Sequence, residues 1–251
     1  MNSGSDEAVP PSPASPEFDP LTYDVLDHVG RYRMGVVEAL LRLPSCVGFA
    51  PKGLRRALRT LGGAAGLLGS APLYGDRRYY YLTTAGEQAL GNDPAGQGVA
   101  RRHGPLSEVA KVRAYGLVAF CCLADRARQR LTATEFREHF PAHHRPGLPM
   151  GYYADHDSGT LGFARVDAGG QGRWERLVGR VRDDIERHRA IPAFRASIDS
   201  GTFELAVVTA TERKAERLRE PFGECSRASG VPVLVHVVPD LIQLVAPPPR
   251  G

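Results

Sequence analysis

The sequence is poor in cysteine and has no long apolar run, and each shortage argues against a class of protein. Its four cysteines, Cys46, Cys121, Cys122 and Cys225, have no CxxC spacing, which argues against a zinc ribbon and against a disulfide framework. The longest uncharged apolar run, residues 114–124, is far shorter than the ~20 residues that a membrane span needs. The N-terminus lacks a basic segment followed by an apolar core, so we expect no signal peptide. We therefore expect a cytoplasmic protein without a membrane partner.

The overall composition is that of a globular protein with a mild basic excess. The 251 residues are 42% hydrophobic, which is enough for one large domain or two small ones. The formal net charge is only +4, so any preference for a polyanion must come from local clusters of charge. Residues 1–18 are rich in proline and serine and are predicted to form a disordered tail, and residues 247–251 a second flexible tail.

The most informative stretch, residues 51–84, combines a basic helix with a short β-hairpin. At 100° per residue, Leu54, Leu58 and Leu61 share one side of the helix. The opposite side carries four cations, which are Lys52, Arg55, Arg56 and Arg59. Such a face would neutralise several DNA phosphates. The alternative is a solvated face without a ligand, since exposed arginines are common on amphipathic helices.

The hairpin follows the basic helix and predicts the wing of a winged-helix domain. Its turn contains Gly75 and Asp76, and Arg77 and Arg78 are expected at the tip, where they would hold the DNA backbone or the minor groove. Three further helices complete the unit and are predicted at residues 20–29, 35–43 and 83–90. The sequence therefore predicts a winged helix-turn-helix over residues 19–94, with the basic helix in the major groove.

The second half alternates strands with helices. Residues 95–127 are predicted to be a linker and a connecting helix that packs on both halves, and residues 128–246 an α/β domain. Two strands are expected around a turn at residues 156–159, followed by a long helix, two buried strands, a helix between them and a last short strand. Their predicted ranges are 173–189 for the long helix, 203–210 and 231–238 for the buried strands, 211–220 or beyond for the intervening helix, and 241–245 for the last strand. This order predicts a partly parallel sheet.

Two motifs, LDHVGRYRMGVVEALLRL at residues 26–43 and YYYLTTAGEQAL at residues 79–90, carry a family resemblance. Together with the basic helix between them, they are similar to the amino-terminal half of the replication-relaxation family. This resemblance implies a mixed α/β protein in which a winged helix is joined to a domain of restriction-endonuclease type. It also implies a DNA-binding protein of a plasmid or an integrated mobile element.

Nucleases of this type hold a divalent metal with acidic residues on two adjacent strands, because Mg²⁺ prefers clustered oxygen ligands. In this sequence Met150 stands where the resemblance implies the first acid, and Arg165 stands where it implies the second. A guanidinium group would repel the ion, so we expect a degenerate domain with no catalytic residues and no cofactor. If the nuclease alternative holds, Asp155, Asp157 and Asp167 are the candidate ligands of Mg²⁺. The resemblance also implies a basic residue on the long helix, for which Arg180 and Arg182 are the candidates.

Two other clusters invite a chemical interpretation. His139, His143 and His144 precede His156 and its neighbouring acids, but their spacing fits no helical HxxxH metal motif. The AGGQG segment at residues 168–172 lacks the Lys-Ser/Thr of a phosphate-binding loop and is expected to be a turn or a weak anion site.

We therefore expect a protein that binds double-stranded DNA and acts in replication, transfer or their regulation, without a catalytic step of its own. Replication or transfer proteins are expected partners, and a dimer is compatible with this role. Two functions of other classes are the alternatives. One is a metal-dependent nuclease acting at an origin, and the other is a transcriptional repressor whose second half senses a ligand or dimerises.

Overall fold

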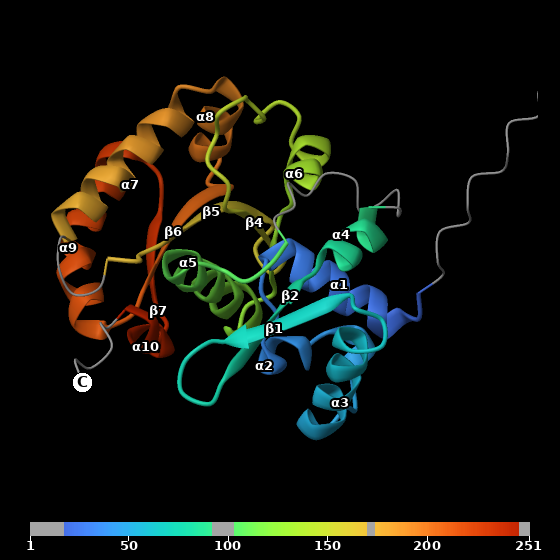
Figure 1. The fold of residues 1–251 in the computed structure, drawn as a ribbon. Coiled ribbons are helices and arrows are strands. Elements are labelled where there is room, and N and C mark those ends of the chain that lie inside the picture. The colour runs from blue at the N-terminus through green and yellow to red at the C-terminus, as the bar shows by residue number, and fades with distance from the viewer. Residues whose placement is uncertain (1–17, 92–102, 170–173, 246–251) are drawn as a thin grey trace, which may run out of the picture.

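The polypeptide forms a mixed α/β structure with two separate β-sheets (Figure 1). The structure is a computed structural model, and it describes residues 18–91, 103–169 and 174–245. The predicted tails at 1–18 and 247–251 therefore lie almost entirely outside the described residues. Within the described ranges, no helix is both long enough and apolar enough to cross a membrane.

The first part of the chain contains four α-helices, a 3-10 turn and a two-stranded sheet. These elements are α1 (Pro20–Tyr32), α2 (Val37–Leu40), η1 (Pro44–Cys46), α3 (Pro51–Gly62), β1 (Leu68–Pro72), β2 (Arg78–Leu82) and α4 (Thr84–Gly91). Asp19 caps α1 by accepting a hydrogen bond from the Thr22 amide at 3.1 Å. The predicted helix at 35–43 is much shorter in the structure, because Pro44 begins a separate 3-10 turn.

The remaining elements form and cover the second sheet. They are α5 (Glu108–Val118), the π-helical segment η3 (Ala119–Leu123), β3 (Arg128–Arg130), α6 (Ala133–His139), β4 (Tyr152–Asp155), β5 (Thr160–Val166), α7 (Trp174–Arg189), α8 (Pro192–Asp199), β6 (Phe203–Thr209), α9 (Glu212–Ser229), β7 (Val233–Val237), η4 (Pro239–Leu241) and α10 (Ile242–Val245). The prediction of a last strand at 241–245 is wrong. Pro239 starts a 3-10 turn there, Leu241 is fully buried, and a short helix follows.

The five strands of the large sheet are ordered β3-β4-β5-β6-β7. β3, β4 and β5 form an antiparallel meander, and β5, β6 and β7 run parallel because helices connect them. The partly parallel sheet expected from the sequence is therefore present. Helices cover both faces of the central strands, which explains why β6 is a nearly continuous apolar run.

Alternate residues of β6 contribute to two different cores. Leu205 and Val207 lie in a cluster with residues of α7, α8 and α9, whereas Ala206 and Val208 lie in a cluster with residues of α5. The large sheet is therefore the middle layer between α5 on one face and α7, α8 and α9 on the other (Figure 1). Gly116 permits this packing, since a Cβ atom there would come within 2.5 Å of a Val166 methyl group on β5.

The core around α5 also includes the first part of the chain. Tyr32, Met34 and Tyr79 belong to the same buried cluster as residues of α5 and β6. Polar contacts continue this connection, since the Tyr79 hydroxyl accepts a hydrogen bond from the Leu106 amide at 2.7 Å. The part of the chain predicted as the winged helix and the part predicted as the α/β domain therefore share one core through α5.

Acid should destabilise this fold through His28, which is 4% exposed on α1. Burial lowers the pKa of His28 from 6.5 to about 4, and its Nε2 atom has no hydrogen-bond partner among the residues of the described ranges. The unfolded chain takes up this proton near pH 6.5 and the folded chain only near pH 4. The contribution of neutral His28 is therefore complete above pH 6.5 and is lost as the pH falls. We expect its share of the free energy of unfolding to decrease by about 2 kcal/mol between pH 8 and pH 5.

Urea denaturation of the parent and of His28→Leu at both pH values measures the contribution of His28 to the free energy of unfolding. The variant should lose about 2 kcal/mol less than the parent on acidification. An equal loss in the two proteins would contradict the assignment to His28.

Candidate nucleic-acid interface

Helix α3 has one buried side and one exposed side. Pro51 occupies its first turn, where a missing amide hydrogen costs no helical bond. Leu54 and Leu58 are 0% and 1% exposed, and they pack in a core formed with α1, α2, η1 and β1. This packing fixes the orientation of the opposite side relative to the rest of the molecule.

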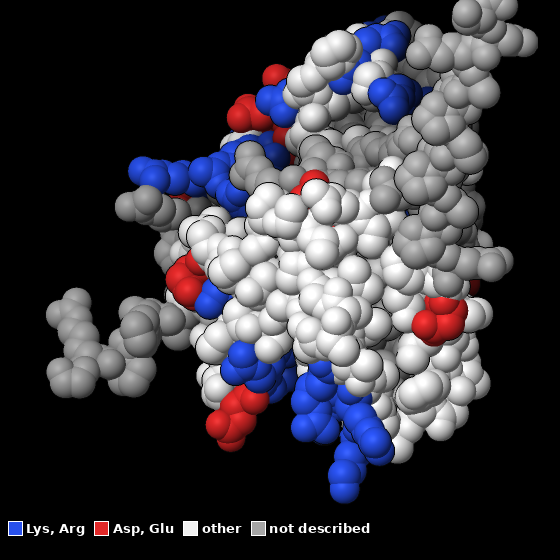
Figure 2. All heavy atoms as spheres, turned by 45° about the vertical axis from the view of Figure 1, so that its right-hand side comes forward, with Lys and Arg blue, Asp and Glu red and all other residues white. Residues whose placement is uncertain are grey.

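The four predicted cations of α3 all lie on its exposed side. Lys52, Arg55, Arg56 and Arg59 are exposed, and none of these side chains has an acidic partner among the residues that the structure describes. Figure 2 shows basic side chains projecting from the lower end of the molecule, where α3 lies in Figure 1. Long cationic side chains on a rigid helix are the groups that contact DNA phosphates.

Strands β1 and β2 pair as an antiparallel hairpin directly after α3, with Leu68 opposite Leu82. A third segment adds to this sheet, because Gly35 and Tyr80 exchange backbone hydrogen bonds of 2.9 and 2.8 Å. Arg78 is exposed at the start of β2, and its guanidinium donates to the backbone carbonyl of Ser70 at 3.1 Å. Arg78 is thus held across the hairpin while its charge remains accessible.

Arg77 is only partly exposed and faces α2 and η4, unlike its neighbour Arg78, so the structure does not present its charge at the tip of the hairpin as predicted. Its guanidinium forms ion pairs with Glu38 of α2 at 3.0 Å and Asp240 of η4 at 2.8 Å, and it lies against the rings of Tyr74 and Tyr115. Both tyrosine hydroxyls also donate hydrogen bonds to Asp240. The bond from Tyr74 is the largest cause that holds the pKa of Asp240 below its ordinary value. The hairpin is therefore fastened to the second half of the chain by Arg77.

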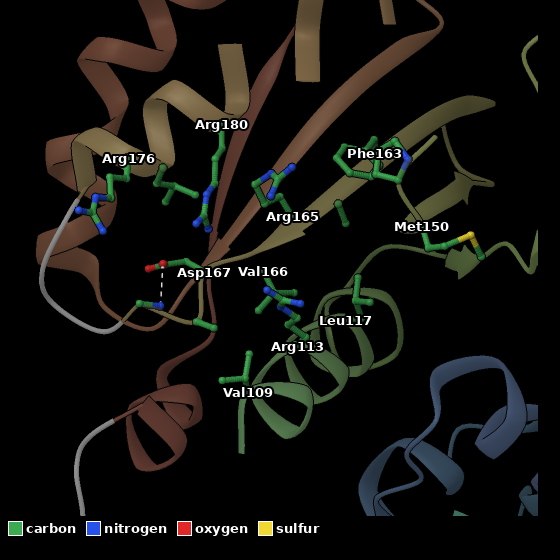
Figure 3. Close-up of a pocket in the computed structure, with 15 residues that line it drawn as sticks. Val109, Arg113, Leu117, Met150, Phe163, Arg165, Val166, Asp167, Arg176 and Arg180 are labelled. Atoms are coloured by element: carbon green, nitrogen blue, oxygen red, sulfur yellow. Dashed lines mark hydrogen bonds between the residues drawn. The ribbon is translucent and has the colours of Figure 1, made fainter. Parts of the chain in front are cut away.

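A pocket of about 400 Å³ lies between α5, β5 and α7 (Figure 3). Met150, Arg165 and Asp167, the positions that the family resemblance singles out, all line this pocket. Asp167 is ion-paired with Lys214 of α9 at 2.5 Å and accepts a hydrogen bond from the Gly169 amide. Arg165 is ion-paired with Asp184 of α7, which is 1% exposed.

Asp155 and Asp157 lie far from Asp167. Asp155 pairs with Thr160 at the start of β5, whereas Asp167 follows the end of that strand. Seven residues of extended chain separate these positions by about 23 Å. The alternative in which Asp155, Asp157 and Asp167 bind one metal ion is therefore wrong on geometric grounds. Asp155 instead accepts hydrogen bonds from the amides of Asp157 and Ser158 and forms an ion pair with Arg128.

The candidate histidines have separate surroundings. His143 contacts the Ser197 hydroxyl through Nε2 at 2.9 Å, and His144 lies beside the ring of Phe136. His139 is exposed at the end of α6. In the part of the chain that the structure describes, no group of three or more histidine, cysteine or acidic side chains is arranged to hold a metal ion.

Three further arginines line the pocket, and of these only Arg180 was a candidate from the sequence. Arg113 of α5 lines the pocket with Arg176 and Arg180 of α7. The spacing of four residues between the last two was a usable signal, because it places them on one face of a helix. No sequence pattern connected them with Arg113. Arg182, the other candidate on this helix, lies instead beside the Cys225 sulfur at 3.4 Å.

The last residues of the AGGQG segment, 170–172, lie outside the described residues.

A comparison of the chain with family models, with curated proteins and with solved structures finds no match in any of the three.

The Arg77–Asp240 pair can be tested by a double-mutant cycle. Both side chains are partly exposed, which limits the strength of the ion pair, but the tyrosine hydroxyls hold Asp240 in place. Thermal or chemical unfolding of Arg77→Ala, Asp240→Ala and the double variant should give a coupling energy of about 1 kcal/mol. Strict additivity of the two single effects would show that the contact contributes nothing to stability.

Proposed function

We propose that the protein binds double-stranded DNA through α3. The observation that carries this proposal is the exposed cationic side of the helix, opposite Leu54 and Leu58, which are buried. A helix fixed by its apolar side and exposing only positive charge suits the major groove and its flanking phosphates. The alternative is a solvated face without a ligand, and binding experiments distinguish the two.

We further propose that residues 19–94 act as a winged helix. Support comes from the order of α1, α2, α3, β1 and β2, and from the backbone hydrogen bonds that attach Gly35 to the hairpin as a third short strand. Arg78 is the hairpin residue proposed to contact DNA, since its guanidinium is accessible. Arg77 is proposed to hold the hairpin in place, because its charge is already compensated by Glu38 and Asp240.

The second half is proposed to be a non-catalytic scaffold of restriction-endonuclease type, as the resemblance to the replication-relaxation family implies. Support comes from the order α5, three antiparallel strands, α7 and the parallel strand β6. At the positions where such an enzyme needs two carboxylates, Met150 offers none and Arg165 is a cation. The proposed setting is the cytoplasm, with a role in the replication or transfer of a plasmid or mobile element, or in their regulation.

Removing two cations from α3 should weaken DNA binding and reduce its dependence on salt. For Arg55→Ala combined with Arg59→Ala, we expect the slope of log affinity against log salt to fall by roughly one to two units, about 0.9 for each lost phosphate contact. Fluorescence anisotropy with a labelled duplex, repeated over a range of salt concentrations, measures both quantities.

Arg137→Ala combined with Arg227→Ala is the matched control, because it removes the same charge from exposed positions on α6 and α9 that have no acidic partner within the described ranges. DNA binding through α3 requires that this control keeps the affinity and slope of the parent. If the control and the α3 variant lose affinity equally, the interaction is a general effect of net charge. Unchanged binding by the α3 variant would refute the proposal directly.

The purified protein should not nick plasmid DNA in the presence of Mg²⁺ or Mn²⁺. Asp167 is engaged by Lys214, and Arg165 adds positive charge where a second carboxylate would be needed. Agarose-gel analysis of supercoiled plasmid, with Asp167→Asn as the control, tests this expectation. Metal-dependent nicking by the parent that disappears in Asp167→Asn would favour the nuclease alternative.

A further inference from the structure

The pocket between α5, β5 and α7 gathers positive charge from three elements. Arg113 comes from α5, Arg165 from β5, and Arg176 and Arg180 from α7 (Figure 3). Only one acidic residue, Asp167, lines the pocket among the residues that the structure describes. Because these basic side chains come from a strand and from helices on both faces of the sheet, the surface composition of a single helix does not explain why they line one pocket.

Most of this charge is uncompensated. Asp184 compensates Arg165 and also lies 3.6 Å from Arg187, while Asp167 is already paired with Lys214. The guanidinium groups that remain, those of Arg113, Arg176 and Arg180, have no acidic partner within the described ranges. Like charges that share a concave site repel one another, so an anionic ligand would be favoured there over water alone.

The guanidinium groups of the pocket favour phosphate over other anions. Planar guanidinium groups match the oxygens of phosphate with two parallel hydrogen bonds, and several of them suit a dianion better than a monoanion. The rest of the lining includes apolar side chains, among them Val109, Leu117 and Phe163. A site of about 400 Å³ that is lined by both charged and apolar side chains has the size of a small-molecule site.

We propose that this pocket binds the terminal phosphate of a nucleotide, with Arg113, Arg176 and Arg180 on the phosphate and the apolar side chains against the base. None of the α3 residues lines the pocket, so the proposal does not depend on DNA binding by α3. The terminal phosphate has two sources, a free mononucleotide or the 5′ end of a nucleic-acid strand.

Equilibrium dialysis of the full chain with labelled adenosine and cytidine monophosphates tests the proposal. We expect saturable binding of at least one of them, competed by inorganic phosphate and not by the unphosphorylated nucleoside. A dinucleotide with a 5′-phosphate and the same dinucleotide without it distinguish the two sources. Competition by the phosphorylated dinucleotide assigns the site to strand ends as well, and its failure to compete assigns the site to free nucleotides.

Two variants identify the residues. The first is Arg113→Gln, and the second combines Arg176→Gln with Arg180→Gln. Each should weaken binding by about tenfold for each guanidinium removed. Arg227→Gln is the control, because this exposed arginine of α9 does not line this pocket. It should bind as the parent does. Thermal unfolding of each variant in the absence of ligand shows whether its fold is intact.

Three results would overturn the proposal. The first is the absence of saturable binding of either monophosphate up to about 1 mM, the weak end of specific recognition. The second is equal weakening in Arg227→Gln, which would indicate general attraction of anions. The third is equally strong competition by the dinucleotide without a terminal phosphate, which would show that the pocket does not recognise the monoester.

Discussion

Close contact between α5 and the large sheet is the constraint on which the pocket and the anchor of the hairpin both depend. Gly116 leaves room for Val166 of β5 to approach the helix backbone. With the helix held there, Arg113 reaches the pocket beside β5, and Tyr115 meets Tyr74 of the hairpin and Asp240 of η4. One helix thus positions a pocket residue and the anchor of the hairpin, and a shift of α5 would move both.

The charge that lines the pocket is mainly positive, and one of its cations, Arg165, is paired with a buried acid of α7. A buried carboxylate is costly unless it is paired, and Asp184 has its partner in Arg165. Replacing Arg165 alone by an acid would therefore leave two carboxylates facing each other in a largely buried position. The ion pair with Asp184 explains how the cation of Arg165 is stable at this place, and how the carboxylate of Asp184 is stable although it is buried.

Sequence periodicity predicts well those elements in which the pattern of apolar residues within the element itself determines which side is buried. The leucines of α3 and the apolar run of β6 are of this kind, and the structure has a helix and a central strand there. The role of Arg77 could not be predicted, since it depends on Asp240, which is 163 residues away in the sequence. The same applies to the pocket, which Arg113 and Arg180 line together only because α5 and α7 lie on either side of β5. Residues 241–245 look like a strand by composition, but β7 ends before Pro239 and the chain turns back onto α5.

The shared core has a consequence for how such a protein can evolve and be engineered. A domain that is exchanged between proteins usually ends at an exposed linker with few contacts across it. Here Tyr32, Met34 and Tyr79 are buried against residues that come later in the chain. Cutting the chain near residue 94 would expose these side chains to water and leave Arg77 without its acidic partner on η4. The first part of the chain is therefore unsuited to transfer as an independent cassette, and recombination would have to preserve α5 together with it.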